Sequence, residues 1–198
     1  MAYNLPTNVT PGSGGHTALH NQTNVAVNDL DTRTAGLEAN SPASIFIPAT
    51  AFVIVSGAPT LTGAAPVAYP RWLLDPAATE IVNTVMHPPL GWNTAKARLY
   101  WSAESTQAGN AMIQFRALPV KVNGELLNTG EGTQSLTLDA PDQSVLAVND
   151  FANPINLATV DPANRPLLQF SIRRIGGDAL DTFPADISFI GLSLIKVS

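Results

Sequence analysis

The chain has 198 residues and carries 10 Lys and Arg against 15 Asp and Glu, which gives a net charge of −5 at pH 7. Charged residues make up 13% of the sequence, about half of the ~25% that is usual in soluble domains. The 14 Gly and 16 Pro exclude a helical bundle, because both residues interrupt long helices. The composition therefore favours an all-β fold.

Composition also excludes several classes of site and partner. The chain has no Cys, so disulfides, thiolate catalysis and zinc–thiolate sites are excluded. Its few lysines and arginines are scattered, whereas nucleic-acid binding depends on clusters of them, so no nucleic-acid partner is predicted. No run of ~18 apolar residues and no basic start followed by an apolar run is present, so we expect neither a membrane partner nor a signal peptide.

The first segment, residues 1–15, is predicted to be an extended arm. Pro6, Pro11 and the Gly-rich run 12–15 prevent a regular helix or strand. Fully extended, the segment reaches roughly 50 Å, at ~3.3 Å per residue. The arm would anchor the protein on a larger surface through apolar contacts of Tyr3, Leu5 and Val9. The alternative is a frayed terminus that has no partner.

Residues 16–40 contain no proline and are predicted to form a short helix. Spacings of four and three alternate along a seam formed by Leu19, Thr23, Ala26, Leu30, Arg33 and Leu37. The helix is rich in Asn, Asp and Thr, which are poor helix formers, so it needs a surface to lie on. That surface is either its own domain or the equivalent helices of sister chains, with Leu19, Ala26, Leu30 and Leu37 as the oligomer seam.

Residues 41–198 are predicted to form one jelly-roll-like β-sandwich of eight to ten strands. Short β-type runs follow one another at the spacing that is typical of sandwiches, and strong turn signals such as Asn123-Gly124 separate them. The runs lie near 45–47, 51–56, 67–74, 80–86, 97–104, 111–118, 120–122, 134–138, 144–148, 167–175 and 186–197.

Motifs for metal binding and nucleophilic catalysis are weak or missing. His16 and His20 have the spacing of two metal ligands on one helix face, but no Glu lies between them and His87 lies in a separate region. A polar helix start or a contact at a threefold axis is the favoured interpretation of this pair. The sequence has no Gly-x-Ser-x-Gly and no phosphate-binding loop. We therefore predict no catalytic residue, no metal and no cofactor.

Paired carboxylates that could cleave a sugar are the remaining enzymatic candidates. They are Asp139 with Asp142 and Asp178 with Asp181. All four lie in turn-forming sequences, where Asp usually binds its own backbone, and that interpretation is favoured. The arginines at 98, 116, 173 and 174 are interpreted as solvent-face or interface partners of acidic residues.

Five aromatic residues could form a platform on which a sugar stacks: Trp72, Trp92, Trp101, Tyr69 and Tyr100. Trp72 and Trp101 lie within apolar strand runs, which favours burial. Trp92 follows Pro88-Pro89 on a predicted loop and is the one candidate for an exposed loop contact.

The N-terminal 38 residues resemble a known group of proteins. The succession of a Pro/Gly-rich start, His16-Thr-Ala-Leu-His20-Asn21 and Ala26-Val-Asn-Asp-Leu-Asp-Thr-Arg33 is similar to a loose motif, H-x-x-x-H-N…A-V-N-x-L-(D/E)-x-R, of small virion proteins of tailed bacteriophages. In that group a short N-terminal arm and helix introduce a trimeric β-sandwich, which serves as a capsid decoration or cement protein, a head fibre or a tail-fibre module.

The resemblance implies a non-enzymatic virion protein located on the capsid surface, whose partners are copies of itself in a homotrimer and the major capsid protein. A β-domain of low charge also has few means of blocking edge-to-edge association, which favours an oligomer. One alternative is a tail-fibre or receptor-binding module in which Trp92 and residues 149–165 meet a host glycan. The other is a sugar hydrolase that uses Asp178 and Asp181.

Overall fold

The computed structural model describes residues 27–29, 43–63, 69–89, 91–120, 133–157 and 167–197. The chain divides into two units, Met1–Pro42 and Ala43–Ser198. In the first unit, residues 27–29 are helical and the side chain of Val27 is exposed. The predicted arm contacts Tyr3, Leu5 and Val9 and the predicted seam residues Leu19, Ala26, Leu30 and Leu37 lie outside the described residues. The arm, the helix seam and the division of the chain into three segments stay predictions.

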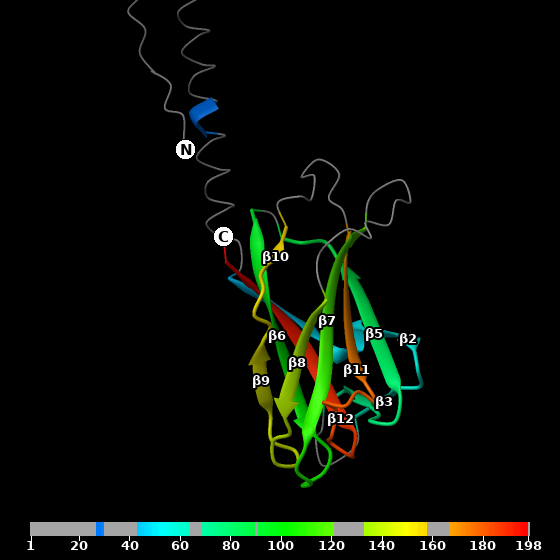
Figure 1. Cartoon of the computed structure of the whole chain (residues 1–198). Coiled ribbons are helices and arrows are strands. Elements are labelled where there is room, and N and C mark those ends of the chain that lie inside the picture. The colour runs from blue at the N-terminus through cyan, green and yellow to red at the C-terminus, as the bar shows by residue number, and fades with distance from the viewer. Residues whose placement is uncertain are drawn as a thin grey trace, which may run out of the picture. The chain divides into compact units, whose positions relative to one another are not determined.

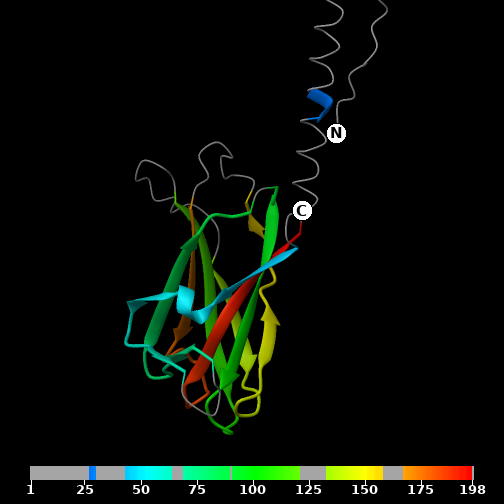
Figure 2. The ribbon, with the colours of Figure 1, turned by 180° about the vertical axis from the view of Figure 1, so that it is seen from behind.

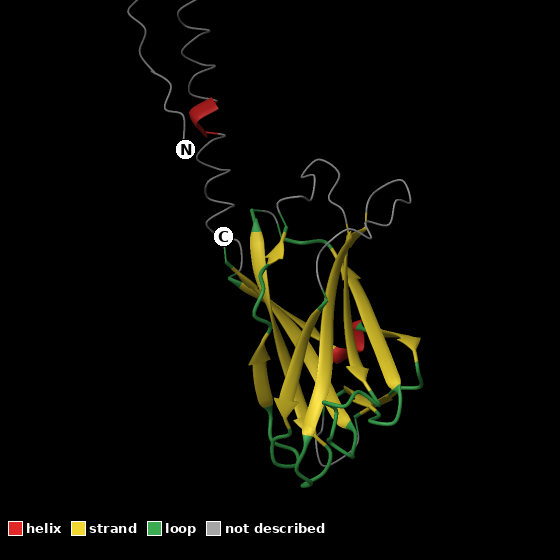
Figure 3. Cartoon of the chain, in the orientation of Figure 1, coloured by secondary structure: helices red, strands yellow, loops and turns green. Residues whose placement is uncertain are grey.

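The second unit is a β-sandwich of two antiparallel sheets, as the predicted jelly-roll-like all-β fold required (Figures 1 and 3). Sheet A contains β1 (Ser44–Pro48), β3 (Thr60–Thr62), β4 (Arg71–Leu74), β6 (Thr94–Ala103), β9 (Ala147–Asp150), β10 (Ile155–Asn156) and β12 (Ile187–Lys196). Sheet B contains β2 (Val53–Ser56), β5 (Thr79–Met86), β7 (Asn110–Val120), β8 (Gln134–Asp139) and β11 (Leu167–Ile175). A single 3-10 turn, η1 (Ala49–Ala51), joins β1 to β2. Within the described ranges no helix is long and apolar enough to cross a membrane.

The described residues hold twelve strands, more than the eight to ten that were predicted. The two that no predicted run covers are β3 and β10, which have three and two residues and therefore carry almost no periodic signal. Strand β7 continues to Val120, while the predicted hairpin at Asn123-Gly124 lies outside the described residues.

Strand β12 organises sheet A. It pairs with β6 along its whole length, and its other edge is shared by β4, at Ile187–Phe189, and by β1, at Gly191–Ile195. Figure 2 shows β1 lying beside β12 before the chain crosses to sheet B. The register between β12 and β6 shifts between Phe189 and Gly191, which makes Ile190 an extra residue of a β-bulge.

The core lies between the two sheets and follows the two-residue period of the strands. In β11, Leu168, Phe170 and Ile172 point inward and are at most 1% exposed. All three tryptophans are also buried. Trp72 donates its indole N–H to the Ala49 carbonyl at 2.8 Å, and Trp101 donates to Asn149 Oδ1 at 2.8 Å.

Trp92 is 4% exposed, so its prediction as an exposed loop contact is wrong. The residue lies two positions before β6 and packs in the hydrophobic core. Burying an indole removes about 150–250 Å² of surface from water. This gain outweighs the tendency of the preceding Pro-rich loop to lie in solvent.

Arg174 is fully buried, which corrects its interpretation as a solvent-face or interface residue. It takes an inward position of β11, and its guanidinium group pairs with Asp181 through bonds of 2.9 and 2.7 Å. The remaining N–H groups donate to the carbonyls of Leu74, Ala185 and Phe183 at 2.6–3.0 Å. All five donors of the guanidinium are therefore satisfied, which is what allows an arginine to occupy a core position.

Arg98 behaves as the sequence predicted. It forms a salt bridge with Asp150 on the surface, where the two side chains are 38% and 48% exposed.

Candidate functional site: an aromatic groove on sheet A

Successive residues of β6 and β12 point alternately to the core and to the outer face of sheet A. In β6, Ala97, Leu99 and Trp101 are buried in the core, so Arg98 and Tyr100 point away from it. Tyr100 lies opposite Gly191 of β12, and β1 completes this side of the sheet by pairing with the same stretch of β12.

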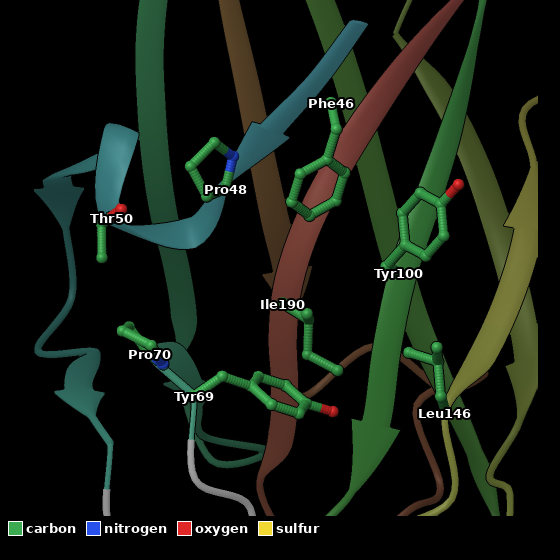
Figure 4. A pocket seen from close by; sticks show the side chains of 8 residues that line it. All are labelled: Phe46, Pro48, Thr50, Tyr69, Pro70, Tyr100, Leu146 and Ile190. Atoms are coloured by element: carbon green, nitrogen blue, oxygen red, sulfur yellow. The ribbon is translucent and has the colours of Figure 1, made fainter. Parts of the chain in front are cut away.

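Three aromatic side chains from separate segments converge on this face. Phe46 comes from β1, Tyr100 from β6, and Tyr69 from the segment before β4 (Figure 4). The rings of Phe46 and Tyr100 meet edge to face, with centroids 5.4 Å apart and an interplanar angle of 85°. Phe46 is 51% exposed and Tyr69 is 39% exposed, so much of their ring surface is open to a ligand.

The three rings line an open groove with a volume of about 400 Å³. This volume lies within the range of small-molecule sites, about 300–1,000 Å³. Ile190 and Leu146 line it beside the tyrosines, and Figure 4 shows the Tyr69 side chain extending toward them. Its remaining lining residues are Pro48, Thr50 and Pro70. Every lining residue is uncharged, and the hydroxyl groups of two tyrosines and one threonine are its polar side-chain groups.

Gly191 makes room for the Phe46 ring. A Cβ atom at this position would lie 2.5 Å from Cζ of Phe46 and 2.8 Å from the Ile47 carbonyl oxygen. The ring therefore lies directly on the backbone of β12, where a side chain at position 191 would otherwise stand. The bulge at Ile190 and the glycine after it together shape this part of the groove.

A buried polar network anchors the segment that carries Tyr69 and Pro70. Arg71, the next residue, donates from Nε to Glu104 Oε1 at 3.0 Å and to Ser188 Oγ at 2.9 Å, and Ser188 also donates to Glu104. Burial raises the pKa of Glu104, but hydrogen bonds from Arg71 and Ser188, together with the Arg71 charge, outweigh it, so the pKa is lowered. The network thus stays ionised at neutral pH and holds the start of β4 in place.

A second ion pair lies on the same outer face. Arg98 binds Asp150 in a bidentate manner, with Nε–Oδ1 and Nη2–Oδ2 distances of 2.5 and 2.9 Å. The hydrogen bond from Arg98 lowers the pKa of Asp150, and the same bond raises the pKa of Arg98. Ser193 donates to the Tyr100 hydroxyl at 3.4 Å, which helps to orient that ring.

The structure thus brings together two of the five candidate platform residues, Tyr69 and Tyr100, and buries the three tryptophans. Sequence reasoning missed Phe46. The available signal was its place in the run Ile45–Ile47, where a large aromatic residue adjoins a residue that faces the core, Ile47. The sequence does not show which residues of other strands share the outer face of sheet A with Phe46.

The candidate acid pair Asp178 and Asp181 serves the structure. The Asp181 side chain is fully buried, and both of its oxygens bind Arg174. Asp178 Oδ1 accepts the backbone N–H of Leu180 at 2.8 Å, the local turn bond that Asp favours. His16 and His20 lie outside the described residues, and the described part of the chain holds no group of three or more His, Asp and Glu suited to a metal.

Compared with protein-family models and with curated proteins, the sequence matches none. Similar solved structures do exist. The mosquito-larvicidal Cry4Aa toxin from Bacillus thuringiensis is 9% identical, with a TM-score of 0.52 over 78% of this chain and 24% of the toxin. The cycloalternan-forming enzyme from Listeria monocytogenes, solved with a pentasaccharide substrate, is 14% identical, with a TM-score of 0.50 over 76% of this chain and 12% of the enzyme.

An isolated module is similar as well. The CBM36-1 domain of a multidomain xylanase from the hindgut metagenome of Trinervitermes trinervoides is 11% identical, with a TM-score of 0.46 over 78% of this chain and 98% of the module. The chain thus spans about a quarter of the toxin and about an eighth of the enzyme. The similarity to the toxin and the enzyme shows a shared fold.

Proposed function

We propose that this chain is a non-enzymatic binding protein whose β-sandwich holds a carbohydrate in the groove of Phe46, Tyr69 and Tyr100. The observation that carries the proposal is the convergence of these three rings on one open groove. Sugar rings have apolar C–H faces that pack against aromatic rings, and such packing buries apolar area on both partners. The Tyr69 hydroxyl, which Figure 4 shows extending toward Leu146, can add a hydrogen bond to the sugar.

The proposal assigns no reaction to the groove. Cleavage of a glycosidic bond needs two carboxyl groups on either side of it, and the lining residues contain none. Asp178 and Asp181, the candidate pair, are held in a turn and in a buried ion pair. The cycloalternan-forming enzyme shares the fold with this chain, but the proposal rests on the groove rather than on that similarity.

The N-terminal resemblance to phage virion proteins supports placing this domain on a virion. In this proposal the segment before residue 43 attaches a homotrimer to the virion, and the sandwich is presented as a receptor-binding module that recognises glycans on the host surface. Several copies on one particle would turn weak individual binding into firm attachment. Capsid decoration, with the major capsid protein as partner, stays the alternative prediction, and its proposed contact residues lie outside the described ranges.

A glycan-binding assay with matched variants tests this function. We expect the full chain to bind oligosaccharides of a host surface, and Phe46→Ala and Tyr69→Ala each to weaken binding about tenfold, or about 1.4 kcal/mol. Both side chains are well exposed, so their loss should leave the fold intact. Leu61→Ala is the control, because Leu61 is 46% exposed on β3 and does not line the groove. A chain that binds no glycan, or variants that bind as the parent does, would refute the proposal.

A further inference from the structure

The groove offers a ligand no charge. All of its lining residues are uncharged, and two arginines on the outer face of sheet A are engaged in ion pairs. Arg71 is bound to Glu104, and Arg98 is bound to Asp150. Lys96, on the same face of β6, also acts on Asp150, whose pKa it lowers. A sugar acid would therefore find no charged partner among the residues that line the groove.

One side of the groove is aliphatic. Ile190, the extra residue of the bulge, and Leu146, which precedes β9, lie beside the two tyrosine rings (Figure 4). A sugar hydroxyl placed against these two side chains would lose part of its water and gain no hydrogen bond from them, which is unfavourable. A methyl group in the same place would bury apolar surface.

The polar groups of the groove suit a small neutral substituent. The hydroxyls of Tyr69, Tyr100 and Thr50 can both donate and accept hydrogen bonds. Figure 4 shows the Tyr69 hydroxyl extending toward Leu146, so this hydroxyl can bond the carbonyl or N–H of an acetamido group or a ring hydroxyl of a deoxy sugar, while the methyl group of either sugar meets Ile190 and Leu146.

We infer that the groove selects neutral sugar units that carry a methyl group, such as acetamido or 6-deoxy sugars, over acidic and fully hydroxylated sugars. The inference rests on the proposed function and names the class of ligand for the same site. Because neither the sugar nor the residues that line the groove carry a charge, binding is insensitive to salt.

Titration calorimetry on the full chain with four trisaccharides tests the inference: chitotriose, a rhamnose trisaccharide, cellotriose and trigalacturonate. We expect chitotriose or the rhamnose trisaccharide to bind at least tenfold more tightly than cellotriose and trigalacturonate, and which of the two binds identifies the source of the methyl group. The favoured affinity should hold as ionic strength rises from ~0.01 M to ~1 M, over which the Debye length falls from about 30 Å to about 3 Å.

Leu146→Gln provides the matched variant, since Leu146 is 50% exposed and lies at the groove. It should abolish the preference for the methyl-bearing trisaccharide. Val148→Gln is the control, because Val148 is 46% exposed but does not line the groove. Equal or tighter binding of cellotriose or trigalacturonate, or an unaltered preference in Leu146→Gln, would overturn the inference and leave the carbohydrate function standing. Failure of every oligosaccharide would overturn both.

Discussion

At the scale of single residues, adjacent residues of the same type differ in burial. Arg173 is partly exposed, whereas Arg174 is fully buried. The difference follows from the period of two in β11, because Phe170, Ile172 and Arg174 share the inward face. An arginine at such a position is stable only if partners meet its donors, and Asp181 and three carbonyls do so. The pair therefore connects β11 to β4 and to the segment between β11 and β12.

Replacing Asp181 should strongly destabilise the sandwich. Asp181→Asn leaves the Arg174 charge buried and without a counterion, which typically costs about 3–5 kcal/mol. We expect a loss of this size in the free energy of unfolding, measured by urea denaturation. Asp150→Asn, which breaks the exposed pair with Arg98, serves as the comparison and should change stability little. Equal effects of the two variants would mean that Arg174 is not buried as described.

At the scale of elements, the strand runs were predictable but their mutual placement was not. Runs near 45–47, 80–86, 134–138 and 167–175 correspond to β1, β5, β8 and β11 because alternation and flanking turns mark each strand locally. The groove needs more than this: Phe46, Tyr69 and Tyr100 meet only because β1 and β6 pair with opposite edges of β12 and Tyr69 leads into β4. Long-range pairing of this kind leaves no periodic signal in one sequence. The burial of Trp92 was missed for the same reason.

The contact between β1 and β12 makes Gly191 a sensitive position. In Gly191→Ala, the new methyl group would approach both the Phe46 ring and the Ile47 carbonyl, so the two strands must move apart. We expect a loss of about 1–3 kcal/mol in unfolding free energy, the usual cost of overpacking, together with weaker glycan binding. In a Phe46→Ala background the same substitution should cost less, because only the clash with the carbonyl remains. Equal costs in the two backgrounds would show that the ring does not rest on β12.

At the scale of the whole molecule, an exposed hydrophobic sheet edge is a candidate surface for self-association. Strand β2 is the end strand of sheet B, and its Val53, Ile54 and Val55 are 62%, 49% and 53% exposed. The strand carries no charged residue, and uncharged hydrophobic edges tend to pair with other chains. The molecule thus has two candidate surfaces for self-association: this edge and the predicted helix seam in residues 16–40.

Substitutions at the two surfaces give different results in light scattering. If the seam holds a homotrimer, the parent chain has three times the 20.8 kDa mass of one copy, and Leu30→Asp reduces it to that of a monomer. Ile54→Lys places a charge on the β2 edge. It should leave the trimer intact and remove only the further edge-to-edge association, which increases with protein concentration. Leu61→Lys, on the end strand of sheet A, is the control for the added charge. A trimer that survives Leu30→Asp and dissociates with Ile54→Lys would mean that sheet B, and not the helix, joins the copies.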